Sequence, residues 1–127
     1  MPEAAAQFAR AKYISLETFR KTGVGVRTPV WFAADPGASE VFYVYSEGDA
    51  GKVKRIRNNA HVRVAPCGAR GNLRGAWVDG QARIVDGEEA AKGQGLLRKK
   101  YGWIKIIGDF FSRLMKHSQA MLQITIS

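Results

Sequence analysis

Six short segments of the chain alternate apolar and polar side chains, which is the pattern of β-strands that bury one face. They are residues 13–19, 25–34, 41–46, 61–66, 76–85 and 120–126. Turn signals stand between several of them, as in Lys21-Thr22-Gly23 and Asp35-Pro36-Gly37, and tight turns join antiparallel neighbours. The pattern predicts a mainly β fold, a small six-stranded antiparallel barrel whose closure protects the strand edges.

Few and short helices are expected to flank these strands. Their expected positions are residues 4–12, 51–58, 88–101 and 103–115. The last of them is apolar over more than half of its surface, which is more than one small barrel can cover. We therefore expect its surplus to meet a second subunit. At 127 residues the chain is expected to form one domain, residues 1–127.

The helix expected at residues 51–58 has an unusual order of charges. It begins with Lys52 and two further bases and has no acid in its first turn. Cations at a helix N-terminus cost about a few tenths of a kcal/mol each, and an anion bound there would reverse that balance. The residues alone leave two interpretations open, a solvated basic face or a phosphate site formed by Ser46, the turn at 49–51 and Lys52.

The helix expected at residues 88–101 is an internal comparison. Asp86-Gly87-Glu88-Glu89 is a capping-box pattern at its start, and Arg98-Lys99-Lys100 stands near its end. Acids first and bases last is the order that the helix dipole favours. The same chain therefore uses the favourable order in one helix and the opposite order in the other.

Pro29 lies in the middle of the segment 25–34. Proline has no N–H to donate to a sheet ladder, so this strand is expected to lie at an edge or to bulge near its middle. A strand interrupted in this way leaves backbone groups available to a ligand.

Composition narrows the class of protein. The net charge is 20 − 11 = +9, which attracts nucleic acid, anionic membrane or an anionic cofactor without selecting among them. The single cysteine, Cys67, excludes an internal disulfide framework and fits a reducing compartment, and the start of the chain lacks a secretory pattern. The most apolar segment, 103–115, contains three charged residues, which argues against a membrane span. We expect a cytoplasmic protein.

Residue patterns for conventional catalysis are missing. The two histidines, His61 and His117, have no cysteine or carboxylate at metal-ligand spacing, so no metal site is predicted. Cys67 is expected to be a buried thiol, and Ser46 has no neighbouring base to activate it. No catalytic acid or base can be assigned. The reactivity of an enzyme built from this chain would come from a bound cofactor.

Aromatic side chains offer walls for a flat ring. The candidates are Trp31, Tyr43, Tyr45, Trp77 and Trp103, although aromatic residues on alternating strands are more often core or interface residues. Exposed beside lysine and arginine, Trp31, Tyr43 or Tyr45 would also suit single-stranded nucleic acid, which is a more distant alternative.

Several segments, in order along the chain, resemble the pyridoxamine 5′-phosphate oxidase-like flavin and deazaflavin enzymes, whose fold is the FMN-binding split β-barrel. They are Arg27-Thr28-Pro29-Val30-Trp31-Phe32, Tyr43-Val44-Tyr45-Ser46, Ala50-Gly51-Lys52-Val53-Lys54-Arg55-Ile56-Arg57-Asn58-Asn59, Val62-Arg63-Val64-Ala65-Pro66-Cys67 and Trp77-Val78-Asp79-Gly80. The resemblance spans roughly residues 12–87 and rests on the ordered set rather than on one motif. Ala60 departs from it, because the family has proline before the following strand.

The resemblance implies a homodimer with the cofactor at the subunit interface. It implies that the backbone of residues 28–31 lies along the cofactor ring and that Ser46 and Lys52 hold the cofactor phosphate. The residues it assigns to cofactor binding are Arg27, Thr28, Pro29, Val30, Trp31, Tyr45, Ser46, Gly51, Lys52, Lys54 and Arg57. Together with the charge order at residues 51–58, this favours the phosphate-site interpretation over the solvated face.

The segments GKVKRIRNN and VRVAPC resemble most closely the members that use the deazaflavin coenzyme F420. The polyglutamate tail of F420 would suit the bases Arg55, Arg57, Arg70 and Arg74. The predicted function is hydride transfer between F420 and a small organic substrate. FMN is the alternative cofactor, and non-enzymatic carriage of the cofactor is the alternative function. The longer C-terminal portion of true pyridoxamine phosphate oxidases has no counterpart here, so that activity is not expected.

Overall fold

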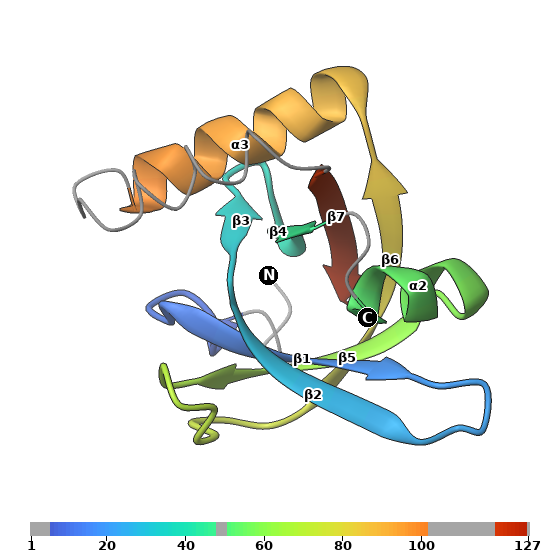
Figure 1. Ribbon diagram of the computed structural model, residues 1–127. Coiled ribbons are helices and arrows are strands. Elements are labelled where there is room, and N and C mark those ends of the chain that lie inside the picture. Colours follow the sequence, from blue (N-terminus) through green and yellow to red (C-terminus); the bar gives the residue numbers. More distant parts are fainter. Residues whose placement is uncertain (1–5, 48–50, 102–118, 127) are drawn as a thin grey trace.

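A computed structural model of the chain describes residues 6–47, 51–101 and 119–126. Its strands are β1 (Tyr13–Phe19), β2 (Gly25–Trp31), β3 (Ala33–Asp35), β4 (Ala38–Glu47), β5 (His61–Cys67), β6 (Val78–Val85) and β7 (Gln119–Ile126), and its helices are α2 (Gly51–Asn58) and α3 (Gly87–Tyr101). The strands form one antiparallel sheet in the order β2-β1-β5-β6-β7-β4-β3, which curls into a half-barrel (Figure 1). The predicted mainly β, antiparallel fold is confirmed. The helix expected at 103–115, with Trp103, lies outside the described residues.

The sheet has seven strands among the described residues rather than six, because the expected second strand is divided. β2 and β3 are the two ends of the sheet, and Phe32 is the single residue that joins them. The Phe32 N–H donates to the Tyr101 hydroxyl, and its carbonyl accepts from that hydroxyl and from the Lys100 ammonium. These bonds use the backbone groups that a continuous strand would give to a ladder.

Lys100 and Tyr101, at the end of α3, therefore fix the point where the sheet changes direction. The Lys100 ammonium also donates to the Ala11 carbonyl, 2.9 Å away, and lies 3.6 Å from the centre of the Phe32 ring. Burial lowers the pKa of Lys100 to about 8 and raises the pKa of the Tyr101 phenol. Lys100 therefore stabilises the backbone at Phe32, in addition to its favourable position near the C-terminus of the helix dipole.

The main core lies on the concave face of the sheet. Alternation places Ile14, Leu16, Val62 and Val64 there, and all four are fully buried. Additional large side chains close this core: Phe8, Phe32 and Phe42 make edge-to-face ring contacts, and Val53 and Ile56 enter it from α2. α2 is thereby anchored against the mouth of the half-barrel.

α3 covers the opposite face of β4 and β7 (Figure 1). Tyr43 and Met121 on that face pack with Leu97 and Tyr101 of the helix. Gly93 allows this close approach, since a Cβ there would lie 2.8 Å from the Met121 sulfur and 2.9 Å from the Tyr43 ring. β4 thus has one face in each core.

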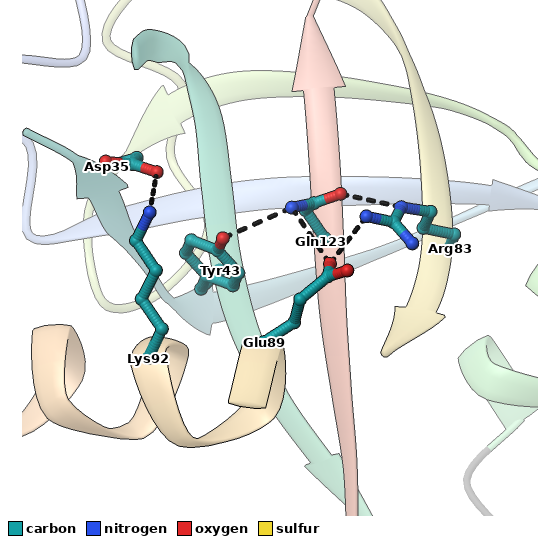
Figure 2. A network of polar contacts seen from close by, with 6 residues as sticks. All are labelled: Asp35, Tyr43, Arg83, Glu89, Lys92 and Gln123. Carbon is teal, nitrogen blue, oxygen red and sulfur yellow. Dashed lines mark hydrogen bonds and ion pairs between the residues drawn. The ribbon is translucent and has the colours of Figure 1, made fainter. Parts of the chain in front are cut away.

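Polar contacts hold the first half of α3 to the sheet (Figure 2). The Glu89 carboxylate accepts from Arg83 and from the Gln123 amide, and that amide also donates to the Tyr43 hydroxyl at 3.2 Å. Lys92 donates to Asp35 at 2.7 Å, which holds the pKa of that carboxyl below its usual value. Glu89, expected to complete a capping box, is thus bonded to the sheet instead.

Two other sequence expectations have different outcomes. Ala6 is helical, but residues 7–12 form turns, with Ala9 N–H to Ala6 carbonyl and Ala11 N–H to Phe8 carbonyl bonds, so the expected N-terminal helix is wrong over residues 7–12. The hairpin turn at 21–23 is confirmed, with Gly23 at φ +90°. Among the described helices, none has the length and apolar character needed to cross a bilayer.

Candidate functional site

Ser46 and the first turn of α2 are near one another in the sequence, and the elements that carry them, β4 and α2, contribute side chains to the same hydrophobic core. Ser46 faces the concave side near the end of β4 and is 5% exposed. Gly51 begins α2 five positions later, and Val53 and Ile56 anchor that helix in the same core. Lys52, in the first turn of α2, is half-buried. The first turn of α2 contains no acid, as expected.

Arg55 adds a second cation to this helix start. A Cβ on Gly51 would lie 2.8 Å from an Arg55 Nη atom, so the guanidinium lies back over the first turn. Its Nε donates to Thr18 Oγ1 at 2.6 Å, which fixes the side chain on β1. Within the described residues, no hydrogen bond uses the Nη groups of Arg55. Sequence reasoning did not place Arg55 in the phosphate site, although its position four residues after Gly51 was a usable signal.

Lys54 and Arg57 occupy the outer side of α2. Both are exposed, whereas Lys52 and Arg55 are half-buried. The helix therefore sorts its bases into two groups, one turned toward the mouth of the barrel and one toward solvent. Of the predicted site residues, Gly51 and Lys52 are in the first turn of α2, Lys54 and Arg57 are on its exposed side, and Ser46 is on β4, so the phosphate site stays a prediction.

β2 presents backbone polar groups along its outer edge. The Arg20 N–H donates to the Val24 carbonyl at 2.9 Å, which fixes the alternation of hydrogen-bonded pairs along the β1–β2 hairpin. Arg27, Pro29 and Trp31 then fall at the positions whose backbone groups point away from β1. Pro29, paired with Ser15, needs no N–H there. The predicted edge position of Pro29 is confirmed.

The side chains of β2 divide between the two faces. Thr28 and Val30 lie opposite Leu16 and Ile14 and face the core, and Pro29 is exposed. Trp31 packs beside the Tyr101 ring, with the ring centres 6.1 Å apart. Of the five predicted β2 residues, only Arg27, Pro29 and Trp31 present backbone groups at the free edge, because those of Thr28 and Val30 are paired with β1.

Arg27 belongs to a separate charged cluster on the convex face. Its Nε donates to Glu17 at 3.0 Å, and Arg63 donates to the other oxygen of the same carboxylate at 3.1 Å. Glu17 is buried, with 7% of its side chain exposed. Both guanidinium groups lie over the Trp77 ring, at 4.6 and 5.0 Å from its centre. Arg27 and Trp77 thus stabilise this face together.

Tyr45 and Tyr43 lie on the α3 side of β4, opposite Ser46. Tyr43 is 2% exposed, so it is a core residue and not a wall for a ring or a base. Tyr45 is half-buried and hydrogen-bonded to Gln94, and burial raises its pKa. The structure therefore separates Tyr45 from its sequence neighbour Ser46 by the thickness of the sheet.

β1 connects α2 to the edge strand β2, because it bonds to Arg55 of the helix and pairs with β2. Thr18, which holds Arg55, pairs with Val26, one position before Arg27. From Val26 to Trp31 the strand extends roughly 17 Å at about 3.3 Å per residue. Arg55, which lies over the first turn of α2, is thus held on the strand next to β2.

Neither a metal centre nor an activated thiol is found among the described residues. No three of their histidine, cysteine and acidic side chains form a metal-binding group. His61 bonds to Asp79 at 2.9 Å and stacks on Phe19. Cys67 is 3% exposed, and burial raises the pKa of its thiol, so the prediction of a buried thiol is confirmed.

Solved structures with this arrangement include a provisionally named pyridoxamine 5′-phosphate oxidase from Listeria innocua. It has a TM-score of 0.63 and 18% identity, covering 96% of this chain and 89% of the other. The chain has the split-barrel fold. An FAD-binding protein from Mesorhizobium loti matches this split barrel with a TM-score of 0.65 and 17% identity, covering 98% of this chain and 86% of the other.

The split barrel is shared by proteins of different function. The heme storage protein HutZ from Vibrio cholerae matches with a TM-score of 0.69 and 12% identity, over 99% of this chain and 89% of the other. No protein-family model matches the chain, and no curated protein does. At these identities the likeness establishes the fold, and the function has to be argued from the site.

Proposed function

We propose that this split barrel is an oxidoreductase that binds a phosphate-bearing flavin-type cofactor, coenzyme F420 in preference to FMN, and transfers hydride between it and a small organic substrate. The observation that carries the proposal is the start of α2, where Lys52 and Arg55 flank an acid-free helix N-terminus five residues after Ser46 in the sequence. When bound, the cofactor would supply the redox chemistry, and the protein would bind, orient and shield it.

The donor set at the helix start suits a phosphate. A phosphate ester is a multiply charged acceptor, and exposed N–H groups at a helix start, a hydroxyl, an ammonium and a guanidinium are the donors that proteins use for it. Arg55 is held in place by Thr18, so little side-chain entropy is lost when it binds an anion. The fit to a phosphate is therefore better than lysine alone would give.

The edge of β2 suits the ring. The carbonyls of Arg27 and Pro29 and the N–H of Arg27 point away from β1, and a flavin or deazaflavin ring carries complementary donors and acceptors along one side. Backbone groups on a paired strand have fixed directions, so they orient a ring without a dedicated side chain. Trp31 at the far end of this edge supplies an apolar wall.

The preference for F420 is supported by the bases beyond the phosphate site. Arg57 on α2 and Arg70 in the loop after β5 are exposed and would suit a polyglutamate tail. We also propose that the chain acts as a homodimer, because the ring edge of β2 lies at the end of the sheet, where a second subunit would shield it.

The first test is a tryptophan-fluorescence titration of the purified protein with F420 and, separately, with FMN. Trp31 lies on the proposed ring edge, so a bound ring will quench it. We expect micromolar quenching by F420 and a weaker response to FMN. The reverse preference would assign FMN, and no binding of either at micromolar concentration would overturn the proposal. F420 binding without turnover across a substrate panel would favour the carrier function.

Lys52→Ala tests the phosphate site, with Lys54→Ala as its matched control. Both lysines are on α2, but Lys54 lies on the exposed side. Loss of a hydrogen bond to a charged group costs about 1.5–3 kcal/mol, so Lys52→Ala is expected to weaken cofactor binding about tenfold to a hundredfold. Lys54→Ala is expected to change it less than about threefold. Equal losses in the two variants would show a diffuse basic surface instead.

A further inference from the structure

The loop after β5, residues 68–77, walls a cleft that the proposed cofactor site does not use. The cleft has a volume of about 540 Å³ and lies between this loop and residues 7–13. Tyr13 and Cys67, which are partners across the β1–β5 ladder, belong to its lining. The volume is within the range of small-molecule sites. The glycine-rich, arginine-bearing loop therefore forms one wall of a cleft large enough for a small molecule.

Hydrogen bonds of the Gln7 side chain and the close packing of Gly75 hold the two walls of the cleft together. The Gln7 amide donates to the Ala76 carbonyl and accepts from the Ala76 N–H, both at 2.9 Å. A Cβ on Gly75 would come within 2.5 Å of the Gln7 side chain and 2.6 Å of Pro66. Arg74 N–H donates to the Pro66 carbonyl at 2.8 Å, which fixes the backbone of the loop's arginine. The cleft is thus preformed.

The charges that line the cleft have one sign. Arg10, Lys12 and Arg74 belong to its lining, and no acidic residue does among the residues that the structure describes. The positive field of Arg74 reaches the Cys67 thiol and opposes the effect of burial on its pKa. By contrast, the arginines of the convex face, Arg27 and Arg63, are neutralised by Glu17. Cations without a lining acid favour an anionic ligand.

The cleft lies next to the far end of the proposed ring edge. Tyr13, in the cleft lining, is the ladder partner of Trp31, and their ring centres are 6.5 Å apart. Trp31 and Tyr13 alternate onto the same face of the sheet. A molecule in the cleft would therefore reach the part of the β2 edge that is farthest from the phosphate site on α2.

We propose that this cleft binds the substrate of the oxidoreductase and that this substrate is an organic anion, with a carboxylate or phosphate group held by Arg10 and Arg74. Its apolar part lies against Tyr13 and points toward Trp31. The assignment of the bound anion as the substrate rests on the proposed function, whereas the binding of an anion in the cleft does not.

The test is an NMR titration of the full chain, labelled with ¹⁵N and without cofactor, using phthalate as the probe and phthalamide as its neutral counterpart. We expect phthalate to shift the amide signals of Gly68, Gly71 and Arg74 and to bind at least tenfold more tightly than phthalamide. The double variant Arg10→Gln, Arg74→Gln should weaken phthalate binding at least tenfold. Arg20→Gln, an exposed arginine in the hairpin turn after β1, is the matched control and should leave the affinity unchanged.

Equal affinity for the two probes, or phthalate shifts confined to α2, would overturn the anion cleft. A repeat of the titration with F420 bound separates this inference from the proposed function. Phthalate should still bind, and its shifts should extend to the Trp31 indole signal. Displacement of one ligand by the other would show that the cofactor itself occupies the cleft and would overturn the substrate assignment. If F420 does not bind and phthalate does, the proposed function fails and the anion cleft stands.

Discussion

The two helices α2 and α3 use their charges in opposite ways. α3 begins with Glu88 and Glu89 and ends with three bases, and its polar side chains bond to the sheet through Glu89, Lys92 and Lys100. α2 begins with bases and has no acid in its first turn, and its Arg55 donates to Thr18 on β1. The charged side chains of α3 are paired within the fold, whereas the bases at the start of α2, we infer, bind a ligand.

This difference separates stability from binding. Substitutions in α3 are expected to lower the free energy of unfolding and to leave cofactor affinity unchanged in the folded protein. Substitutions of the inward bases of α2 are expected to lower cofactor affinity and to change the free energy of unfolding only a little, because cations at a helix N-terminus contribute little to the stability of the unbound chain. Functional sites are where such local conflicts are found.

Leu97→Ala should give the largest effect on stability. Leu97 is 1% exposed and packs on Tyr43 and Met121 from the middle of α3. Truncation of a buried leucine costs about 2–5 kcal/mol, which urea unfolding of the two proteins will measure. Cofactor affinity, measured where the variant is still folded, should stay within about twofold. A stability loss below about 1 kcal/mol would mean that α3 is not part of the cooperative core.

Arg55→Gln should give the largest effect on binding. It removes the guanidinium that lies over Gly51 while keeping most of the stem, so cofactor affinity is expected to fall about tenfold to a hundredfold in fluorescence titration. Loss of the bond to Thr18 should cost stability about 1 kcal/mol at most. Lys54→Gln, which removes a positive charge on the exposed side of α2, is the control. Similar losses of affinity in both variants would contradict the division of α2 into two groups of bases.

Two glycines of α3 allow a finer comparison. Alanine favours a helix over glycine by about 1 kcal/mol at either position. At Gly95 nothing lies within 4 Å of the added methyl, so Gly95→Ala should raise stability by about that amount. At Gly93 the methyl would meet Tyr43 and Met121, and crowding of this kind costs about 1–3 kcal/mol. Thermal unfolding should therefore rank Gly95→Ala above Gly93→Ala, and the opposite ranking would show that α3 can move away from the sheet.

Local patterns predicted the parts of the fold that local residues determine. β1 and α2 have their expected bounds, since alternation and helix signals lie within each segment. The division at Phe32 was not predictable in this way, because the groups that capture its backbone come from Tyr101, 69 residues away. The burial of Tyr43 likewise depends on where α3 packs. Long-range contacts of this kind leave no periodic signal in the segment that they change.

The candidate site shows the same limit. The acid-free start of α2 was visible in the sequence, and Ser46 and Lys52 followed from it. Arg27 was assigned to the cofactor with its neighbours on β2, but its side chain bonds to Glu17, which is a cross-strand partner. The loop 68–77 carried glycines and arginines without any catalytic motif, and its use became visible only through the cleft that it forms with residues 7–13.

Lys100→Met should give the smallest effect, which is a change in how the free energy of unfolding depends on pH. Burial lowers the pKa of Lys100 to about 8 in the folded protein, from the ordinary lysine value of 10.5. Between these values the unfolded chain binds more protons at this residue than the folded one, so stability gained through Lys100 rises with pH. Below about pH 8 both states are protonated, and the folded protein bears the full cost of the buried charge.

Urea unfolding of the wild type and Lys100→Met at pH 7, 8 and 9 tests this sign. The free energy of unfolding of the wild type should increase relative to the variant by about 1 kcal/mol per pH unit at most, beginning near pH 8. The raised pKa of Tyr101 acts in the other direction, because the unfolded phenol ionises first, but it does so only near and above pH 10. Parallel pH profiles would mean that the Lys100 ammonium remains hydrated, and that α3 holds Phe32 through Tyr101 alone.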